Sequence, residues 1–198
     1  MKLKGFTLAE LLIALAILGV IATFTIPKVL LANQSQQYNA LGKEAIGAIS
    51  EAFQAYKLQN SISASFNPGN VTPYLNYVRV VTNGLLMDHR PPETSWACDS
   101  ASPCYRLHNG GTLQLFTASC FGGTAQNNAV WFGFDPDSQY SGTTNGPGKA
   151  LHIALYANGR ITTTVNLRSD TQVDWGCGGS PAPQTPVVNG DPSWFSWN

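Results

Sequence analysis

The sequence predicts an α+β protein in which one long N-terminal helix is followed by a loop-rich region and an antiparallel sheet. Three observations support this fold class. A nearly unbroken apolar segment fills residues 6–27, and an amphipathic helical pattern continues directly over residues 28–58. Short alternating segments separated by turn residues occupy the second half of the remaining region, residues 59–198. Residues 1–5 form a separate, short polar leader.

The composition favours an exported protein over a cytosolic enzyme. The chain has 198 residues, with 11 basic and 11 acidic side chains and a formal net charge of +0. It has neither the basic excess of a nucleic-acid-binding protein nor an acidic tail. Charged residues make up only 11%, against roughly 25% in an average soluble domain. We therefore expect an extracytoplasmic domain rich in loops and β-strands.

The first apolar segment has the length of a membrane span. As a helix, residues 6–26 cover roughly 30 Å, which is about the thickness of a bilayer core. Lys2 and Lys4 precede this segment. Because positive residues stay on the cytoplasmic side, we expect a single-pass protein with a cytoplasmic N-terminus and an exported remainder.

One carboxylate interrupts the apolar segment. Glu10 would lie at membrane depth, where an ionised group costs at least a few kcal/mol and normally has a partner. No lysine or arginine lies between Glu10 and Lys28. Cleavage between Gly5 and Phe6 would create a new amine one helical turn away. That amine could pair with Glu10 of the same chain or, in a staggered stack, of a neighbouring chain.

These residues carry a resemblance to a known family. The string Gly5-Phe6-Thr7-Leu8-Ala9-Glu10, followed by a long apolar helix, resembles the cleavage and methylation motif of the type IV pilin and type II secretion pseudopilin superfamily. Pro27 matches a helix-breaking proline of many major pilins. The direct resemblance covers about the first 30 residues. An ordinary secretory signal fits less well because no good small-residue cleavage site follows the apolar run, and a simple signal anchor leaves the motif unexplained.

The resemblance implies a structural role and no catalytic activity. It implies a pilin fold, removal of residues 1–5 by a prepilin peptidase, and N-methylation of Phe6 at the bacterial inner membrane. The apolar helices would then pack into an extracellular or periplasmic filament, with Glu10 neutralising the Phe6 amine of an adjacent subunit. The filament would be a type IV pilus or a type II secretion pseudopilus, built with other subunits on an inner-membrane platform. The alternative is a membrane-anchored surface module that binds carbohydrate, DNA or protein.

The helix is expected to continue beyond Pro27. Tyr38, Leu41, Ala45, Ile49, Ala52, Phe53 and Tyr56 recur at spacings of three and four, which is the pattern of one apolar helix face. Pro27 removes one backbone hydrogen bond, so we expect a kink or loosened turn near residues 23–27, eased by threonine hydroxyls.

A sheet is expected after a largely irregular region. Residues 59–111 contain several turn signals, with room for short helical or strand pieces at 71–83. Strands are predicted at 112–119, 129–134, 151–156 and 160–167, the last two joined by a tight turn at Ala157-Asn-Gly159.

Four cysteines in the second half predict disulfides. An even number of cysteines in an exported chain is typical of two disulfides, and three pairings of Cys98, Cys104, Cys120 and Cys177 are possible. One of them closes a short loop from Cys98 to Cys104 and leaves Cys120 with Cys177. The other interpretation is a zinc site, but the chain has no C-x-x-C motif.

The segment between the second and third predicted strands is a candidate calcium loop. It resembles a segment of pseudopilins and minor pilins, some of which bind Ca²⁺ there. Asp135, Asp137 and Asn145 supply oxygen donors of the kind that calcium prefers. Two carboxylates are few for a tight site, and Lys149 stands where an acidic ligand would be expected. A solvated loop whose Asp and Gly residues form turns is the favoured reading.

Overall fold

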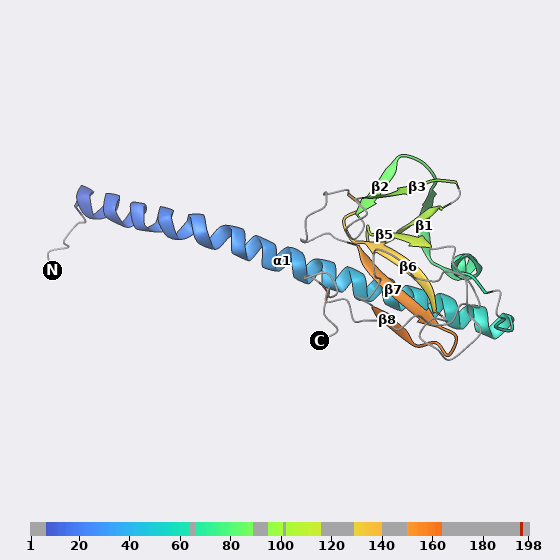
Figure 1. The fold of residues 1–198 in the computed structure, drawn as a ribbon. Coiled ribbons are helices and arrows are strands. Elements are labelled where there is room, and N and C mark those ends of the chain that lie inside the picture. The colour runs from blue at the N-terminus through green and yellow to red at the C-terminus, as the bar shows by residue number, and fades with distance from the viewer. Residues whose placement is uncertain are drawn as a thin grey trace, which may run out of the picture.

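The computed structural model shows a long helix with a small head packed on its C-terminal half (Figure 1). It describes residues 7–63, 66–88, 95–100, 102–115, 129–139, 150–163 and Phe195, with residues 86–88 and 95–96 described by their backbone alone. The elements are α1 (Leu8–Gln59), the 3₁₀ helix η1 (Pro68–Tyr74), β1 (Tyr77–Val81), β2 (Leu85–Asp88), β3 (Ser95–Cys98), β4 (Cys104–Leu107), β5 (Thr112–Leu115), β6 (Ala129–Asp135), β7 (Leu151–Tyr156) and β8 (Ile161–Thr163). We call everything that packs on the second half of α1 the head.

Helix α1 is one continuous helix of 52 residues, which confirms the expected continuation beyond Pro27. At 1.5 Å per residue it is about 78 Å long. It ends at Gln59, and the extended backbone of the C-cap residue Asn60 donates its N–H to the Tyr56 carbonyl at 2.9 Å. This end lies within two residues of the expected one.

Pro27 lies inside the helix and two threonines precede it. The proline has no N–H for the carbonyl of Thr23, one turn earlier. The Thr23 hydroxyl donates to the Val20 carbonyl at 2.7 Å, and the Thr25 hydroxyl donates to the Ile21 carbonyl. The hydroxyls therefore contact carbonyls of the preceding turn, while a kink at Pro27 stays a prediction.

The head is built on a six-stranded antiparallel sheet with the order β1-β4-β5-β6-β7-β8. The strands expected at 129–134 and 151–156 are confirmed, as is the tight turn between β7 and β8, where Gly159 has a φ of +88°. Strands β5 and β8 begin where they were expected or one residue later. Their expected later residues, 116–119 and 164–167, lie outside the described part of the chain.

The region expected to be largely irregular contributes four strands. The short pieces expected at 71–83 are confirmed by η1 and β1, whereas β2, β3 and β4 correct the sequence-based expectation. Strands β1 and β4 pair with each other and add two strands to the main sheet, while β2 and β3 form a separate two-stranded sheet. Each of the four has only four or five residues, too few for a clear alternating pattern. They form because strand partners elsewhere in the fold satisfy their backbone groups.

One hydrophobic core joins α1 to the sheet. The helix contributes Ala45, Ile49, Ala52 and Phe53, each at most 1% exposed. Opposite them lie buried side chains of the central strands: Leu113, Val130, Phe132, Phe134, Leu151, Ile153 and Leu155. Phe195, near the C-terminus, belongs to the same cluster and is 6% exposed. This core fixes which side of the helix faces the sheet.

Candidate functional site

The N-terminal end of α1 is organised around Thr7 and Glu10. Thr7 is the N-cap residue, and its hydroxyl accepts a hydrogen bond from the Glu10 backbone N–H at 3.3 Å. The Glu10 carboxylate reaches back and accepts from the Thr7 N–H at 2.8 Å and from the Thr7 hydroxyl at 2.7 Å. This reciprocal capping box satisfies donors that a helix start leaves without partners.

The capping box also explains how Glu10 is accommodated in an apolar helix. Both hydrogen bonds that the carboxylate accepts end on Oε2. The other oxygen, Oε1, takes no hydrogen bond from the described residues, so it can accept one from a cation outside the helix. Gly5 and Phe6, the two residues predicted to flank the cleavage point, lie outside the described part of the chain.

The first half of α1 presents apolar side chains on all sides. From Leu8 to Leu31 its large hydrophobic residues are between 51% and 76% exposed. The segment is long and apolar enough to cross a membrane, and none of its most apolar window is buried within the chain. An apolar surface of this extent requires lipid or other protein around it. The helix therefore has two environments, one supplied by the head and one that must come from outside the chain.

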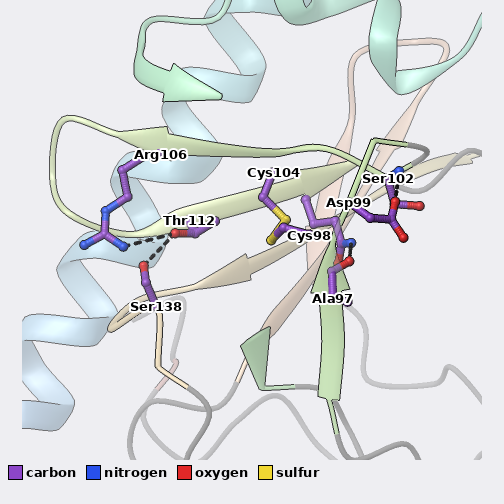
Figure 2. Close-up of a disulfide and its surroundings, with 9 residues drawn as sticks. Ala97, Cys98, Asp99, Ser102, Cys104, Arg106, Thr112 and Ser138 are labelled. Carbon is purple, nitrogen blue, oxygen red and sulfur yellow. Dashed lines mark hydrogen bonds between the residues drawn. A yellow bond between two sulfur atoms is a disulfide. The ribbon is translucent and has the colours of Figure 1, made fainter. Parts of the chain in front are cut away.

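A disulfide joins the two sheets of the head. Cys98, at the end of β3, bonds Cys104, at the start of β4, with a Cα–Cα distance of 5.4 Å (Figure 2). Both cysteines are buried against Val81 and Leu85. This confirms the short-loop pairing and excludes the zinc interpretation for these two residues. Cys120 and Cys177 lie outside the described residues, so their pairing stays a prediction.

Asp135 and Asp137 organise the turn after β6. Asp135 is fully buried, and its Oδ1 accepts the backbone N–H groups of Asp137 and Ser138 at 3.2 and 2.8 Å. Asp137 accepts the Gln139 N–H on Oδ1 at 3.0 Å. Ser138 has a φ of +56°, a left-handed conformation that these bonds hold in place.

The described geometry of this turn corresponds to the turn-forming interpretation of the two aspartates. Asn145, the third proposed calcium ligand, lies outside the described residues. Within the described ranges, no group of three or more His, Cys, Asp or Glu side chains is arranged to hold a metal ion. Calcium binding by Asp135, Asp137 and Asn145 therefore stays a prediction.

The turn after β6 also contacts α1, which the sequence reading did not anticipate. The Tyr38 hydroxyl donates to Oδ2 of Asp137 at 3.4 Å. Partial burial raises the pKa of Tyr38, and the negative charges of Asp137 and Asp135 raise it further. The helical pattern placed Tyr38 on the apolar face, but a carboxylate 99 residues away in the sequence gives no local signal of its partner.

The N-terminal residues of the chain match a known motif. Residues 1–26 match the family model described as the prokaryotic N-terminal methylation motif. The chain thus combines a prepilin-type N-terminus with the helix-on-sheet architecture of the pilin fold. The disulfide-linked head is consistent with that class.

The chain is also similar to a type II secretion protein. It is 35% identical over 68 residues to the type II secretion system core protein G of Vibrio cholerae serotype O1 (strain ATCC 39315 / El Tor Inaba N16961). The matched region is 34% of this chain and 46% of that protein, so the chain spans about half the length of the relative it matches. No solved structure matches the chain.

Proposed function

We propose that this chain is a structural subunit of a type IV pilus or of a type II secretion pseudopilus. The observation that supports this most directly is the exposed apolar half of α1, which carries the methylation motif and a single, capped carboxylate near its start. Apolar helices of this kind bury their surface against one another in a filament core. The similarity to a type II secretion core protein supports the same assignment.

The proposed mechanism is assembly, with no catalytic step. A prepilin peptidase cuts between Gly5 and Phe6 at the cytoplasmic face of the inner membrane, and the new N-terminus is methylated. The head, exported from the cytoplasm, remains anchored by α1 until the subunit enters the filament. There, Oε1 of Glu10 accepts a hydrogen bond from the Phe6 amine of an adjacent subunit. This pairing removes two unpaired charges from an apolar environment and thereby favours one register of stacking.

Processing and location test the proposal directly. The protein would be recovered from native membranes and from the fraction sheared from the cell surface, then measured by intact mass and N-terminal sequencing. We expect a chain that begins at N-methylated Phe6. Its presence in the sheared fraction identifies a surface filament, whereas its restriction to membranes identifies a pseudopilin or a minor subunit.

A processing-deficient variant supplies the control. Gly5→Val adds a branched side chain beside the predicted cleavage point and leaves the helix from Leu8 onward unchanged. We expect it to insert into the membrane, to keep Met1 and to be absent from filaments. A wild-type chain that retains Met1 in cells with an active prepilin peptidase would contradict the proposal and favour an anchored surface binding module.

A further inference from the structure

The part of α1 that first contacts the head runs from Tyr38 to Ala45, and we call it the neck. Residues of α1 before Tyr38 are almost all exposed, whereas Tyr38 and Leu41 are partly buried against the core and Gly42 and Ala45 are buried. The first turn of the neck therefore makes few apolar contacts with the head, and the next turn is well packed against it. Any rocking of the head on the helix would open this first turn most easily.

Polar contacts reinforce this turn from two sides. The turn after β6 supplies Asp137, which accepts a hydrogen bond from the Tyr38 hydroxyl at 3.4 Å. The turn between β4 and β5 supplies Asn109, whose Nδ2 donates to Oε2 of Glu44 at 3.1 Å and to the Leu41 carbonyl at 3.5 Å. We call Tyr38, Leu41, Glu44, Asn109 and Asp137 the neck cluster.

The two turns are themselves locked together. The Ser138 hydroxyl donates to the Gly110 carbonyl at 3.1 Å and also contacts the Thr112 hydroxyl at 2.6 Å. The guanidinium of Arg106 donates to the same Thr112 hydroxyl at 3.4 Å, so β4, β5 and the turn after β6 meet at one point (Figure 2). Asn109 is held in turn because its Oδ1 accepts the Gly111 N–H at 3.0 Å.

A small rotation of the head about the neck produces a large displacement of the N-terminal end of α1. Thirty residues separate Leu8 from Tyr38, which corresponds to about 45 Å of helix, so a 10° rotation at the neck moves the helix start by about 8 Å. This displacement is larger than the reach of a hydrogen bond or ion pair. A loosely held head would therefore leave the position of Glu10 undefined relative to neighbouring heads.

We propose that the neck cluster fixes the angle between the head and the membrane-proximal half of α1, and that this fixed angle is required for the subunit to enter a filament. The step from angle to assembly rests on the proposed function, whereas the rigidity of the neck can be measured on the isolated subunit. Tyr38, Glu44, Asn109 and Asp137 are positioning residues in this scheme. They hold the helix and make no contact with the Glu10 end.

Two conservative substitutions weaken the neck without emptying the core. Tyr38→Phe removes only the hydroxyl that Asp137 accepts from. Asn109→Asp keeps the oxygen that accepts the Gly111 N–H and replaces Nδ2 with a second carboxylate oxygen facing Glu44 and the Leu41 carbonyl. Glu44→Gln in the Asn109→Asp background restores a donor opposite that oxygen and serves as the rescue.

A matched control removes the hydroxyl of Tyr74, which lies in η1 and contacts the C-terminal end of α1. The Tyr74 hydroxyl donates to Oε1 of Gln59 at 3.2 Å and accepts from Nδ2 of Asn60 at 3.1 Å, at the far end of α1. Tyr74→Phe therefore makes the same chemical change as Tyr38→Phe but leaves the neck intact.

The measurement is a distance distribution between the helix and the head. Nitroxide amino acids at Asn33 and Val78, both exposed, would be introduced as noncanonical residues so that no cysteine is needed for labelling and the Cys98–Cys104 disulfide stays intact. Double electron–electron resonance on the full-length subunit in detergent then reports the spread of distances between the two labels. Thermal unfolding of the head and the yield of sheared filaments are measured for the same variants.

We expect a narrow distribution for the wild type and for Tyr74→Phe, and a broadened one for Tyr38→Phe with Asn109→Asp. The loss of each net hydrogen bond raises the population of displaced heads by about fivefold. Filament yield falls in the double variant and recovers partly with Glu44→Gln, while the heads of all variants remain folded at the temperature of the measurement. An unchanged distance distribution in the double variant would show that the neck cluster does not fix the angle between the head and the helix. A broadened distribution with normal filament yield would show that this angle is not required for assembly. A wild-type subunit that never enters filaments would overturn the proposed function, while the distance distribution would still test the rigidity of the neck.

Discussion

The two halves of α1 have similar apolar side chains, but these side chains are exposed in the first half and buried against the sheet in the second. Phe24, in the first half, is 71% exposed, whereas Phe53, in the second, is fully buried against the sheet. The charged residues of the second half, Lys43, Glu44, Glu51 and Lys57, are all exposed, whereas Glu10 is the only charged residue from Leu8 to Pro27. The apolar side chains of the second half are covered by the head of the same chain. Those of the first half require lipid or another protein to cover them. One continuous helix thereby links a folded head to an environment outside the chain.

The sharpest test of this contrast removes the same ring from each half. Phe53→Ala should destabilise the head by about 3–5 kcal/mol, because it empties a fully buried site between helix and sheet. Phe24→Ala should leave head stability unchanged, since its ring has no partner among the described residues of the head. Thermal or urea unfolding of the detergent-solubilised subunit measures both. Equal destabilisation by the two variants would show that the halves do not differ as described.

The second test changes a carboxylate in each half. Glu10→Leu should leave membrane insertion intact and reduce filament yield strongly, because it removes the group proposed to pair with the Phe6 amine. Glu51→Leu, on the exposed side of the second half, provides the matched control and should assemble. The readout is the amount of subunit in membrane and sheared fractions. Normal filaments from Glu10→Leu would refute selection of the register by this carboxylate.

Two glycines, one in the head and one in the second half of α1, sharpen the comparison. A Cβ at Gly111 would lie 2.4 Å from the Phe134 ring, so Gly111→Ala should destabilise the head by about 1–3 kcal/mol through overpacking. A Cβ at Gly47, within α1, meets nothing within 4 Å, and Gly47→Ala should stabilise the helix by up to about 1 kcal/mol. Chemical denaturation measures both. Stabilisation by Gly111→Ala would mean that the turn between β4 and β5 does not approach Phe134 as described.

The smallest expected effect concerns the pH dependence of the neck. The pKa of Tyr38 is raised in the folded head, so folding favours its protonated form. Its contribution to stability is fully present below the unfolded pKa of about 10 and is lost as the pH rises through the higher folded pKa. Unfolding midpoints measured on both sides of pH 10 should fall more for the wild type than for Tyr38→Phe. Tyr105, whose pKa burial also raises, is present in both proteins and cancels in the comparison. Parallel midpoints for the two proteins would contradict the contribution of Tyr38.

Local patterns predicted the elements whose residues carry strong signals. The apolar and amphipathic periodicities predicted α1 to within two residues at its C-terminal end, and Ala157-Asn-Gly159 predicted the turn between β7 and β8. Strands β1 to β4 were not delimited, because short strands are stabilised by pairing with residues distant in the sequence. The Cys98–Cys104 disulfide was one of the proposed pairings, but its role in joining two separate sheets required the topology.

The candidate site divides in the same way. The motif from Gly5 to Glu10 and the apolar helix after it are contiguous, so the sequence by itself determined the match to the methylation motif and the long helix, and it indicated the residue proposed to guide assembly. The capping bonds between Thr7 and Glu10 also arise from neighbours one turn apart. Only the tertiary structure brought Asn109 and Asp137 onto the neck of α1. The physical reason is that periodicity and capping act over a few residues, whereas the contacts of the neck depend on how the sheet folds two distant turns back onto the helix.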